Sequence, residues 1–489
     1  MRKSGILMHI SSLPSRCGIG TLGKEAYNFV DFLKKSGQTY WQILPVNPTS
    51  YGDSPYQSPS AFAGNPYFID LFTLKEEGLL TEHEINNYFF GADETKVDYY
   101  RLFQNRYPLL RTAFQRFEPN EKFENFSEKN KFWLEDFALF MALKEENHYR
   151  SWIYWDSTLK QHNSDEVNEA KKRLSAKTEF YKFLQFEFYK QWAALKKYAN
   201  ENGIKIIGDM PIYVALDSAE VWSMPEQFML DEENLPIKVA GCPPDAFSEK
   251  GQLWGNPIYN WEKMKNDGFT WWIERLKNAA TLYDRVRIDH FRGFEAYYTI
   301  DYGKEDATEG AWEKGPGIEL FEKIKSALGE IDIIAEDLGY LTPEVHKLLA
   351  DCGYPGMKVL QFAFDPYGDS VYLPHNHVPN CVLYTGTHDN DTTKGWFSSL
   401  GNEEKAFACK YLGIKAENDM PEALIRAALS SVAETAVIPI QDYLKLGSEA
   451  RMNIPSTLGG NWEYRVKSED LSEELAGYIA ELTRTYRRG

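Results

Sequence analysis

Three carboxylate side chains in the second half of the chain come directly after short apolar stretches. Asp289 ends the sequence RVRID, Glu336 ends IDIIAE, and Asp389 follows CVLYTGTH. Cleaving a glycosidic bond requires two carboxyl groups, one ionised to attack or stabilise the anomeric carbon and one protonated to release the leaving oxygen. These three residues are therefore candidate catalytic residues for chemistry on a sugar chain.

The neighbours of two of these acids suit the two roles. Arg287 stands two residues before Asp289, so an extended strand places both side chains on one face, where the fixed positive charge favours an ionised carboxylate. Glu336 follows the apolar residues Ile-Ile-Ala, where burial and nearby carboxylates should hold its proton. Any one acid could equally form an ion pair or cap a helix, but three at three strand ends favour a shared site.

Histidines beside two of the acids, His290 and His388, raise the alternative of a metal site. Metal-binding histidines usually occur at spacings such as H-x-x-x-H, whereas the chain has only His375-Asn376-His377, in a proline-containing loop. The five cysteines include no C-x-x-C pair, which argues against zinc and against a disulfide framework. We expect neither a metal nor another cofactor.

To meet at one site, the acids must lie on elements whose ends converge. The chain holds eight short apolar runs, which are typical of strands buried on both faces, as in parallel sheets. Amphipathic helical patterns lie between them, so the sequence predicts an α/β fold, a (β/α)8 TIM barrel with large insertions at its catalytic face. The expected strands are residues 5–13, 40–46, 204–210, 285–289, 331–336, 357–364, 381–387 and 436–441.

Two gaps between the expected strands are too long for simple crossovers. We expect residues 52–175 to form a mainly helical insertion after strand two, and residues 211–278 to form an insertion after strand three. The second gap contains a segment rich in proline and glycine, 240–257, which we expect to be a loop covering the cleft. We find no repeat or low-complexity region. Barrel folds often use this much sequence as one elaborated domain, so residues 1–489 are expected to be a single catalytic domain.

The composition bears on possible partners. The formal net charge is −18, and so acidic a surface repels nucleic acid and anionic membrane lipids but is compatible with a neutral substrate. The 13 Trp and 30 Tyr fit a sugar-binding cleft as well as a large aromatic core. We recognise no signal peptide and no apolar run of about 18 residues, which predicts a cytoplasmic location.

Around the three acids the sequence resembles a known enzyme family. RIDHFRG (287–293), IIAEDLG (333–339) and TGTHDND (385–391) look like three signature regions of the amylomaltases, or disproportionating enzymes, which form glycoside hydrolase family 77 of the α-amylase clan. Further segments are similar in the same order over nearly the whole chain: HISSLPS, GDSPYQSPSAFAGNPYFIDL, GDMPIYVALDSAEVW, PPDAFSEKGQLWGNPIY and RMNIP.

The resemblance implies a role for each residue of the site. Asp289 matches the nucleophile, Glu336 the general acid and base, and Asp389 the carboxylate that stabilises the transition state. The implied activity is that of a 4-α-glucanotransferase, in which a segment of amylose, a maltooligosaccharide or another α-1,4-glucan passes through a covalent intermediate on Asp289 to a 4-hydroxyl of glucose or another maltosaccharide. The positions that match substrate-binding residues are Tyr56, Asp209, Trp254, Arg287 and His388.

The resemblance also sets expectations for geometry and for departures from the family. A retaining mechanism requires the carboxyl groups of Asp289 and Glu336 to lie about 5–5.5 Å apart. The calcium-linked Asn-His pair of α-amylases is missing after Asp209, so we expect no structural calcium. Ser456 and Tyr464 differ from the residues usual in the family, and we expect both to lie far from the chemistry.

Two alternatives to a transferase are open. A hydrolase would use the same carboxylates, because only the acceptor differs, and exclusion of water by the segment 240–257 would decide between transfer and hydrolysis. A glucan-binding protein without activity would keep the aromatic residues, but it has no need for Asp289 or Glu336.

Overall fold

The computed structural model, which describes residues 2–244, 248–339 and 341–489, is built around a sheet of eight parallel strands. The strands follow one another around the sheet in the order β10-β11-β12-β1-β2-β3-β6-β9. Their bounds are β1 (Lys3–Leu7), β2 (Tyr40–Gln42), β3 (Lys205–Met210), β6 (Arg285–Ile288), β9 (Ile333–Ala335), β10 (Gly356–Val359), β11 (Cys381–Tyr384) and β12 (Thr435–Pro439).

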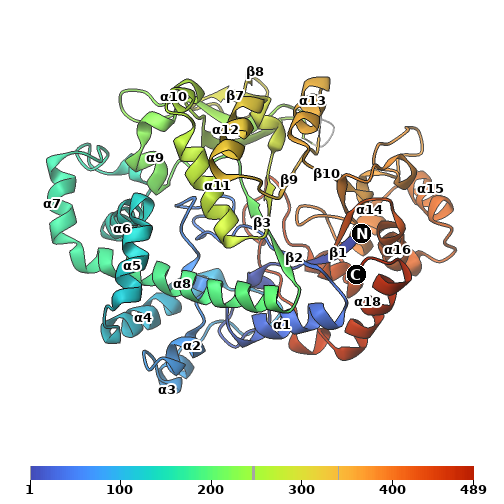
Figure 1. Cartoon of the computed structure of the whole chain (residues 1–489), viewed down its shortest axis with the longest axis horizontal. Helices are drawn as coiled ribbons and strands as arrows, with labels where there is room; N and C mark the ends of the chain where they lie inside the picture. The colour runs from blue at the N-terminus through green and yellow to red at the C-terminus, as the bar shows by residue number, and fades with distance from the viewer. Residues whose placement is uncertain (1, 245–247, 340) are drawn as a thin grey trace.

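The sheet curls into a nearly closed barrel (Figure 1). Neighbouring strands pair in register, so that Gly5 of β1 faces Tyr40 of β2 on one side and Val437 of β12 on the other. Where the first and last strands of the order meet, the Ala335 N–H donates to the carbonyl of Pro355, just before β10, over 3.0 Å. Each strand overlaps one of the eight expected runs, and the predicted (β/α)8 barrel is confirmed.

The observed strands are shorter than the apolar runs that predicted them. The first was expected to reach residue 13, but β1 ends at Leu7 and the buried residues Ile10–Ser12 form a 3-10 turn. The sixth was expected to reach residue 364, but β10 ends at Val359 and Leu360–Phe362 form another such turn. Apolarity indicates burial and not extended conformation, so it continues through buried turns at the strand ends.

Two arginines of β6 point into the barrel together, because side chains alternate along a strand. Arg285 Nη1 donates to Thr435 Oγ1 of β12 over 3.3 Å, and Arg287 Nε lies 3.4 Å from Met357 Sδ of β10. The rest of the interior is mainly apolar and includes Leu7, Tyr40, Ile207, Ile334, Met357, Val382, Tyr384 and Val437.

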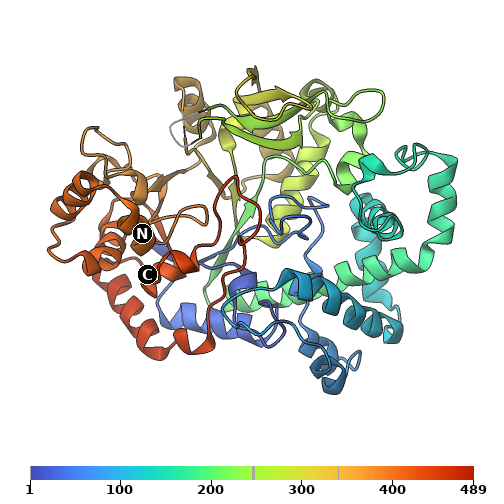
Figure 2. The same ribbon diagram turned by 180° about the vertical axis from the view of Figure 1, so that it is seen from behind.

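Helices cover the outside of the barrel (Figures 1 and 2). The helices that lead from one strand to the next, or follow the last, are α1 (Lys24–Lys35), α8 (Ser175–Glu201), α11 (Thr270–Leu282), α12 (Ile318–Leu328), α13 (Pro343–Cys352), α16 (Met420–Ser430) and α18 (Glu473–Thr485). Strict alternation was wrong at one crossover, because the described residues between β10 and β11 form only 3-10 turns. The carboxyl-terminal third adds α14 (Thr393–Ser399), α15 (Asn402–Leu412) and α17 (Ile440–Tyr443).

Residues 52–175 are mostly helical, and the helices lie at one end of the molecule, left in Figure 1. Side-chain caps explain where several helices begin. Thr81 and Glu84 form a reciprocal capping box, and Asp98, Asn120 and Ser164 each accept a backbone N–H of the first turn. The helices are α2 (Leu71–Glu76), α3 (Glu82–Asn86), α4 (Tyr99–Arg116), α5 (Glu121–Lys129), α6 (Lys131–Glu146) and α7 (Asp165–Arg173).

The segment 240–257 is not the simple loop that its prolines and glycines suggested. Half of it lies on β4 (Lys238–Cys242) and β5 (Gln252–Pro257), which pair antiparallel, while residues 245–247 lie outside the described residues. β4 also pairs with β7 (Ala296–Asp301), which pairs with β8 (Ala311–Lys314). β7 and β8 follow β6, so this four-stranded sheet joins two insertions, the second of which was not predicted. The insertion after β3 also contains α9 (Ala219–Ser223) and α10 (Trp261–Asn266).

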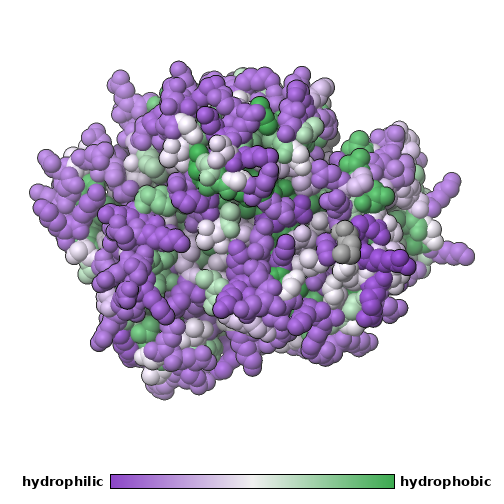
Figure 3. Space-filling view, in the orientation of Figure 1, coloured by the Kyte–Doolittle hydropathy of each residue, from purple (hydrophilic) through white to green (hydrophobic). Residues whose placement is uncertain are grey.

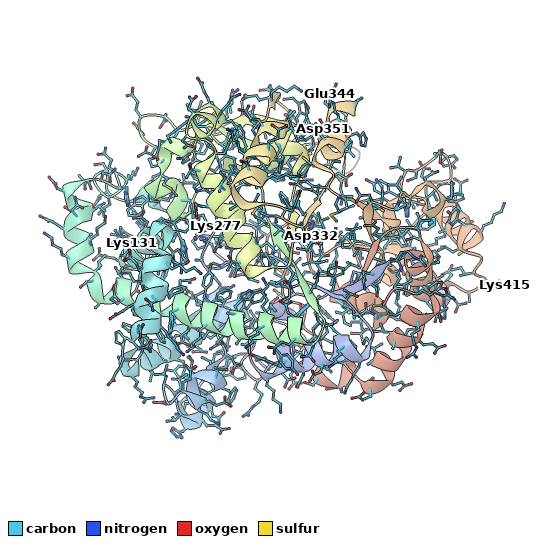
Figure 4. The ribbon with its side chains drawn as sticks, viewed as in Figure 1. Lys131, Lys277, Asp332, Glu344, Asp351 and Lys415 are labelled. Atoms are coloured by element: carbon cyan, nitrogen blue, oxygen red, sulfur yellow. The ribbon has the colours of Figure 1, made fainter. Side chains whose placement is uncertain are left out.

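Hydrophilic side chains cover most of the face drawn in Figure 3. Charged residues that are labelled in Figure 4 lie on the solvent-exposed sides of helices. Lys277 is on α11, and Glu344 and Asp351 are on α13. Among the residues with described structure, no helix combines the length and the apolarity needed to cross a membrane.

Candidate active site

The carboxyl ends of β3 and β6 place an arginine between two acids. Arg287 Nη1 donates to both carboxylate oxygens of Asp209 at 2.7 Å, and Arg287 Nη2 lies 2.9 Å from Asp289 Oδ1. The Arg287 and Asp209 side chains are 4% and 0% exposed, whereas that of Asp289 is 30% exposed. Burial raises the pKa of Asp209, and the guanidinium of Arg287 opposes that shift. A buried ion pair therefore supports one accessible carboxylate, Asp289, at the mouth of the barrel.

Tyr56, from the loop after β2, closes this cluster. Its hydroxyl donates to Asp209 Oδ2 over 2.7 Å and lies 2.9 Å from His388 Nε2, so its oxygen accepts from the histidine. The rings of Tyr56 and His388 are stacked, with centroids 5.3 Å apart and planes 13° apart. Trp462 packs against them at centroid distances of 5.8 and 5.9 Å. Three rings from three distant segments thus form an aromatic wall beside Asp209.

Glu336, directly after β9, is held by two backbone N–H groups. Its Oε2 accepts from the His290 N–H at 2.7 Å, and its Oε1 accepts from the Leu338 N–H at 2.8 Å. Burial, followed by the charge of Asp289, raises the pKa of Glu336 from 4.5 to about 8, although Arg287 and these N–H groups oppose the shift. A carboxyl group that keeps its proton at neutral pH therefore lies near an ion-paired carboxylate.

The residue after Asp289 has a backbone conformation that residues with a side chain seldom adopt. His290 has φ 52° and ψ 48°, in the left-handed region, and its N–H is the donor to Glu336. Trp254, partly buried on β5, packs edge-on against the His290 ring at 4.8 Å. His290 therefore links the end of β6 both to Glu336 and to the antiparallel sheet, at a strained position of the kind that clusters in functional sites.

Asp389 lies in the turn that follows β11. Its Oδ1 accepts from Asn453 Nδ2 at 2.6 Å, and its backbone carbonyl accepts from Arg451 Nη2 at 2.7 Å. Its Oδ2 lies 3.3 Å from His388 Nε2, and its side chain is 44% exposed. Through these contacts the structure brings all eight residues predicted from the sequence into one connected region.

The loop that carries Tyr56 is anchored to the insertion after β3. The buried Oε1 of Glu220, in α9, accepts from Ser60 Oγ at 2.7 Å and from the Ala61 N–H at 3.0 Å. Gln57 Nε2 lies 3.4 Å from the carbonyl of Trp254. These hydrogen bonds therefore join the insertion after β2 to the insertion after β3 at the edge of the site.

Sequence reasoning noted RMNIP as a similar segment but gave no site role to the segment 451–462, which contributes Arg451, Asn453 and Trp462 to the site. Figure 2 shows this segment, in red before α18, beside the blue loop after β2. Tyr464, expected to lie far from the chemistry, is buried and lines a small cavity that His388 also lines. The available signal was a tryptophan close to the turn residues Pro-Ser-Thr-Leu-Gly-Gly, since loops of this composition often carry functional side chains.

Within residues 2–244, 248–339 and 341–489, no group of three or more His, Cys, Asp or Glu side chains is arranged to hold a metal ion. That the chemistry needs no cofactor stays a prediction. The site brings together carboxyl groups, an arginine and aromatic rings. Paired carboxyl groups of this kind can catalyse the cleavage of a glycosidic bond.

Comparison with known proteins decides the family. The model of the 4-alpha-glucanotransferase family matches residues 8–471. The chain belongs to the 4-alpha-glucanotransferase family. Membership confirms the resemblance of the three acidic motifs and identifies the chain as a transferase. Relatives in this family include the 4-alpha-glucanotransferases of Clostridium butyricum and Thermus thermophilus, which are 52% and 49% identical over 98% and 97% of this chain and 100% and 96% of their own lengths.

The fold is shared with solved structures of amylomaltases. The amylomaltase from Streptococcus agalactiae in complex with acarbose is 45% identical, with a TM-score of 0.98 over 100% of both chains. The amylomaltase from Corynebacterium glutamicum, at 19% identity, has a TM-score of 0.80 over 99% of this chain and 75% of its own and supports the fold alone.

Proposed function

We propose that this member of the 4-alpha-glucanotransferase family transfers a segment of an α-1,4-glucan to the 4-hydroxyl of glucose or another maltosaccharide by a retaining double displacement. One observation carries the proposal. Glu336 keeps a proton because of burial, while Asp289, beside it, is ion-paired with Arg287. A carboxyl group that keeps its proton, next to a carboxylate that is paired with an arginine, suits the acid and the nucleophile of this chemistry.

In the first half of the reaction, an oxygen of Asp289 attacks the anomeric carbon of the donor. The bond from that carbon to the glycosidic oxygen breaks, and Glu336 gives its proton to that oxygen. In the second half, the ionised Glu336 takes the proton from the acceptor 4-hydroxyl, and the acceptor oxygen displaces Asp289 from the anomeric carbon. Two inversions return the α configuration, which requires the two carboxyl groups to lie at the retaining separation of about 5–5.5 Å.

The remaining residues act on the sugar that is bound at the point of cleavage. Asp389 accepts hydrogen bonds from its hydroxyls, and we propose that these bonds strengthen as the ring flattens in the transition state. Tyr56 and His388 present stacked rings, and flat aromatic faces suit the apolar faces of a pyranose ring. Asp209 and Arg287 hold this surface together through their buried ion pair.

A hydrolase with the same carboxylates is the alternative, and the transferase names of the relatives favour transfer. Trp254 and the β4–β5 pair are the parts that we propose limit the access of water to the covalent intermediate. The structure in complex with acarbose is that of a relative, and it supports a site for α-glucans here. A cytoplasmic location and the absence of nucleic-acid and membrane partners remain predictions from the sequence.

Incubation with maltotriose tests the proposal. We expect glucose together with saccharides longer than maltotriose, and incorporation of labelled glucose when it is supplied as acceptor. Asp289→Asn protein, prepared in the same way, controls for contaminating activities. A product mixture of only glucose and maltose, without labelled oligosaccharides, would establish the hydrolase.

A further inference from the structure

Two residues of the segment 451–462, Arg451 and Asn453, contact Asp389. The proposed mechanism gives this segment no role. Arg451 Nη2 donates to the carbonyl of Asp389 at 2.7 Å, and Arg451 Nε donates to the carbonyl of Asn453 at 2.7 Å. Asn453 Nδ2 then donates to Asp389 Oδ1 at 2.6 Å. Arg451 therefore binds the backbone carbonyls of both Asp389 and Asn453, and Asn453 in turn binds the carboxylate of Asp389.

Within the part of the chain that the structure describes, Asp389 has few other restraints. It lies five residues beyond the end of β11, its side chain is 44% exposed, and among the described residues its N–H makes one long bond, of 3.3 Å, to Thr387 Oγ1. Its carboxylate also lies 3.3 Å from His388 Nε2. The bond from Asn453 is therefore the shortest restraint on the orientation of this carboxylate.

Hydrogen bonds within the segment 451–462 hold it against the aromatic wall of Tyr56, His388 and Trp462. The Trp462 N–H donates to the carbonyl of Met452 at 2.7 Å, and the Ile454 N–H donates to Asn461 Oδ1 at 2.9 Å. Trp462 has a φ of 65°, a strained conformation for a bulky residue, and its ring packs on Tyr56 and His388. The amide of Asn453 is thereby placed relative to the wall on which the sugar is proposed to bind.

We propose that Asn453 and Arg451 are positioning residues, which hold the carboxylate of Asp389 in the orientation that stabilises the transition state. This inference rests on the proposed function, in which Asp389 contacts the sugar. Asn453 suits the task because its neutral amide donates to an ionised carboxylate without adding a competing charge. Arg451 acts one step further back, through the two carbonyl oxygens that it joins.

Variants of Asn453 separate positioning from general support of the fold. We expect Asn453→Ala to lower kcat for maltotriose disproportionation by about 10–100-fold, since misplacement of a group by an ångström has effects of this size. KM and the melting temperature should change little. Asn453→Asp keeps the shape but places a second carboxylate against Asp389, so the acidic limb of kcat/KM should move upward by about one pH unit.

Three further proteins make the result decisive. Asn376→Ala removes the same kind of bond, from an asparagine amide to the carboxylate of Asp369, on an exposed turn, and should leave kcat unchanged. Arg451→Lys keeps the charge but cannot bridge both carbonyls, and should lower kcat less than Asn453→Ala does. Asp389→Asn tests the proposed function itself and should lose transfer.

If Asp389→Asn is inactive while both Asn453 variants keep the wild-type kcat and pH profile, the positioning role is overturned and the proposed function stands. If Asp389→Asn remains active, the proposed role of Asp389 fails. If Asn453→Ala unfolds, Asn453→Asp decides, because a wild-type pH profile from that folded isostere also overturns the inference.

Discussion

Arg287 contacts two carboxylates, one on β3 and one directly after β6, and of these two the one after β6 is the accessible one. Its bonds to Asp209 are buried with it, so neither charge of that pair is left without a partner. The other terminal nitrogen of its guanidinium, Nη2, reaches Asp289 at the barrel mouth. Removing Arg287 would leave the buried carboxylate of Asp209 without a charged partner, so variants of Asp289 and Glu336 are the cleaner tests of the chemistry.

Asp289→Asn should lower the rate of transfer by at least about 10⁴-fold, because a neutral amide cannot act as the nucleophile. The fold should remain intact, since the Arg287–Asp209 pair does not depend on the substituted group. Product ladders from maltotriose and a thermal melt measure both effects. If pure, folded Asp289→Asn protein gave a nearly normal series of products from maltotriose, Asp289 would not be the nucleophile.

Glu336→Gln should lower transfer by about 10²–10⁴-fold, because the amide has no proton to give to the leaving oxygen. In the wild type the acid form is required, and the pKa of Glu336 is about 8. The rate of the first half reaction should therefore fall as the pH rises through about 8. A pH profile of kcat/KM for maltotriose checks this, and a flat profile between pH 7 and pH 9 would contradict the role.

The same group links pH to stability. The folded-state pKa of Glu336 lies above its ordinary value of 4.5, so the stabilisation it contributes is present below that value and is lost as the pH rises through about 8. Glutamine cannot ionise, so Glu336→Gln should melt at a higher temperature, relative to the wild type, at pH 9 than at pH 5. A difference in melting temperature that is equal at both pH values would contradict the raised pKa.

Among the elements, the β4–β5 pair matters most because it brings Trp254 to His290, the residue next to Asp289. We expect Trp254→Ala to raise the ratio of hydrolysis to transfer several-fold, because water would reach the intermediate more easily. Leu253→Ala is a matched control, since Leu253 is 39% exposed and points to the other face of β5. An unchanged ratio with a clear loss of melting temperature would show that Trp254 only anchors the sheet.

The element that sequence analysis failed to find is the antiparallel sheet to which this pair belongs. The sequence QLWGNP of β5 has no clear alternation, and Gly251 before it and Pro257 at its end favoured a loop. β4 finds its other partner in β7, across the whole of α10, α11 and β6. Pairing over such a separation leaves no local signal, whereas the barrel strands were visible because each is apolar throughout.

For the whole molecule, the two ends of the chain meet beside α16 and α18, as Figure 1 shows. Arg488 is fully buried and donates to the carbonyls of Lys3, Leu429 and Ala433, among others. It therefore ties the penultimate residue to the start of β1 and to the approach to β12. These bonds lie where β1 and β12, which are neighbours in the sheet, both begin.

Arg488→Ala should destabilise the protein by about 2–4 kcal/mol, because several buried carbonyls lose a charged donor. The kinetic constants at 25 °C should stay unchanged, since the residue lies at the opposite end of the strands from the site. Urea unfolding and maltotriose kinetics on the same preparation measure the two quantities. Lys277→Ala, on the exposed face of α11, serves as the control and should lie within about 0.5 kcal/mol of the wild type.

The sequence by itself determined the barrel, the order of its strands along the chain and the residues at their carboxyl ends. Apolar strands carry their own signal in composition, and Asp289, Glu336 and Asp389 stand where each such run stops. The same reasoning placed Arg287 on the face of Asp289, because the alternation of side chains along a strand is a local property.

Only the tertiary structure decided which groups complete the site. Trp462 and Asn453 come from a segment more than sixty residues beyond Asp389, and Glu220 holds the loop of Tyr56 from another insertion. The protonation of Glu336 also depends on the fold, since it follows from burial and from the distance to Asp289. Hydrogen bonds, ring contacts and electrostatic effects depend on distances in the folded chain. A single sequence contains the interacting residues but does not show which of them come into contact.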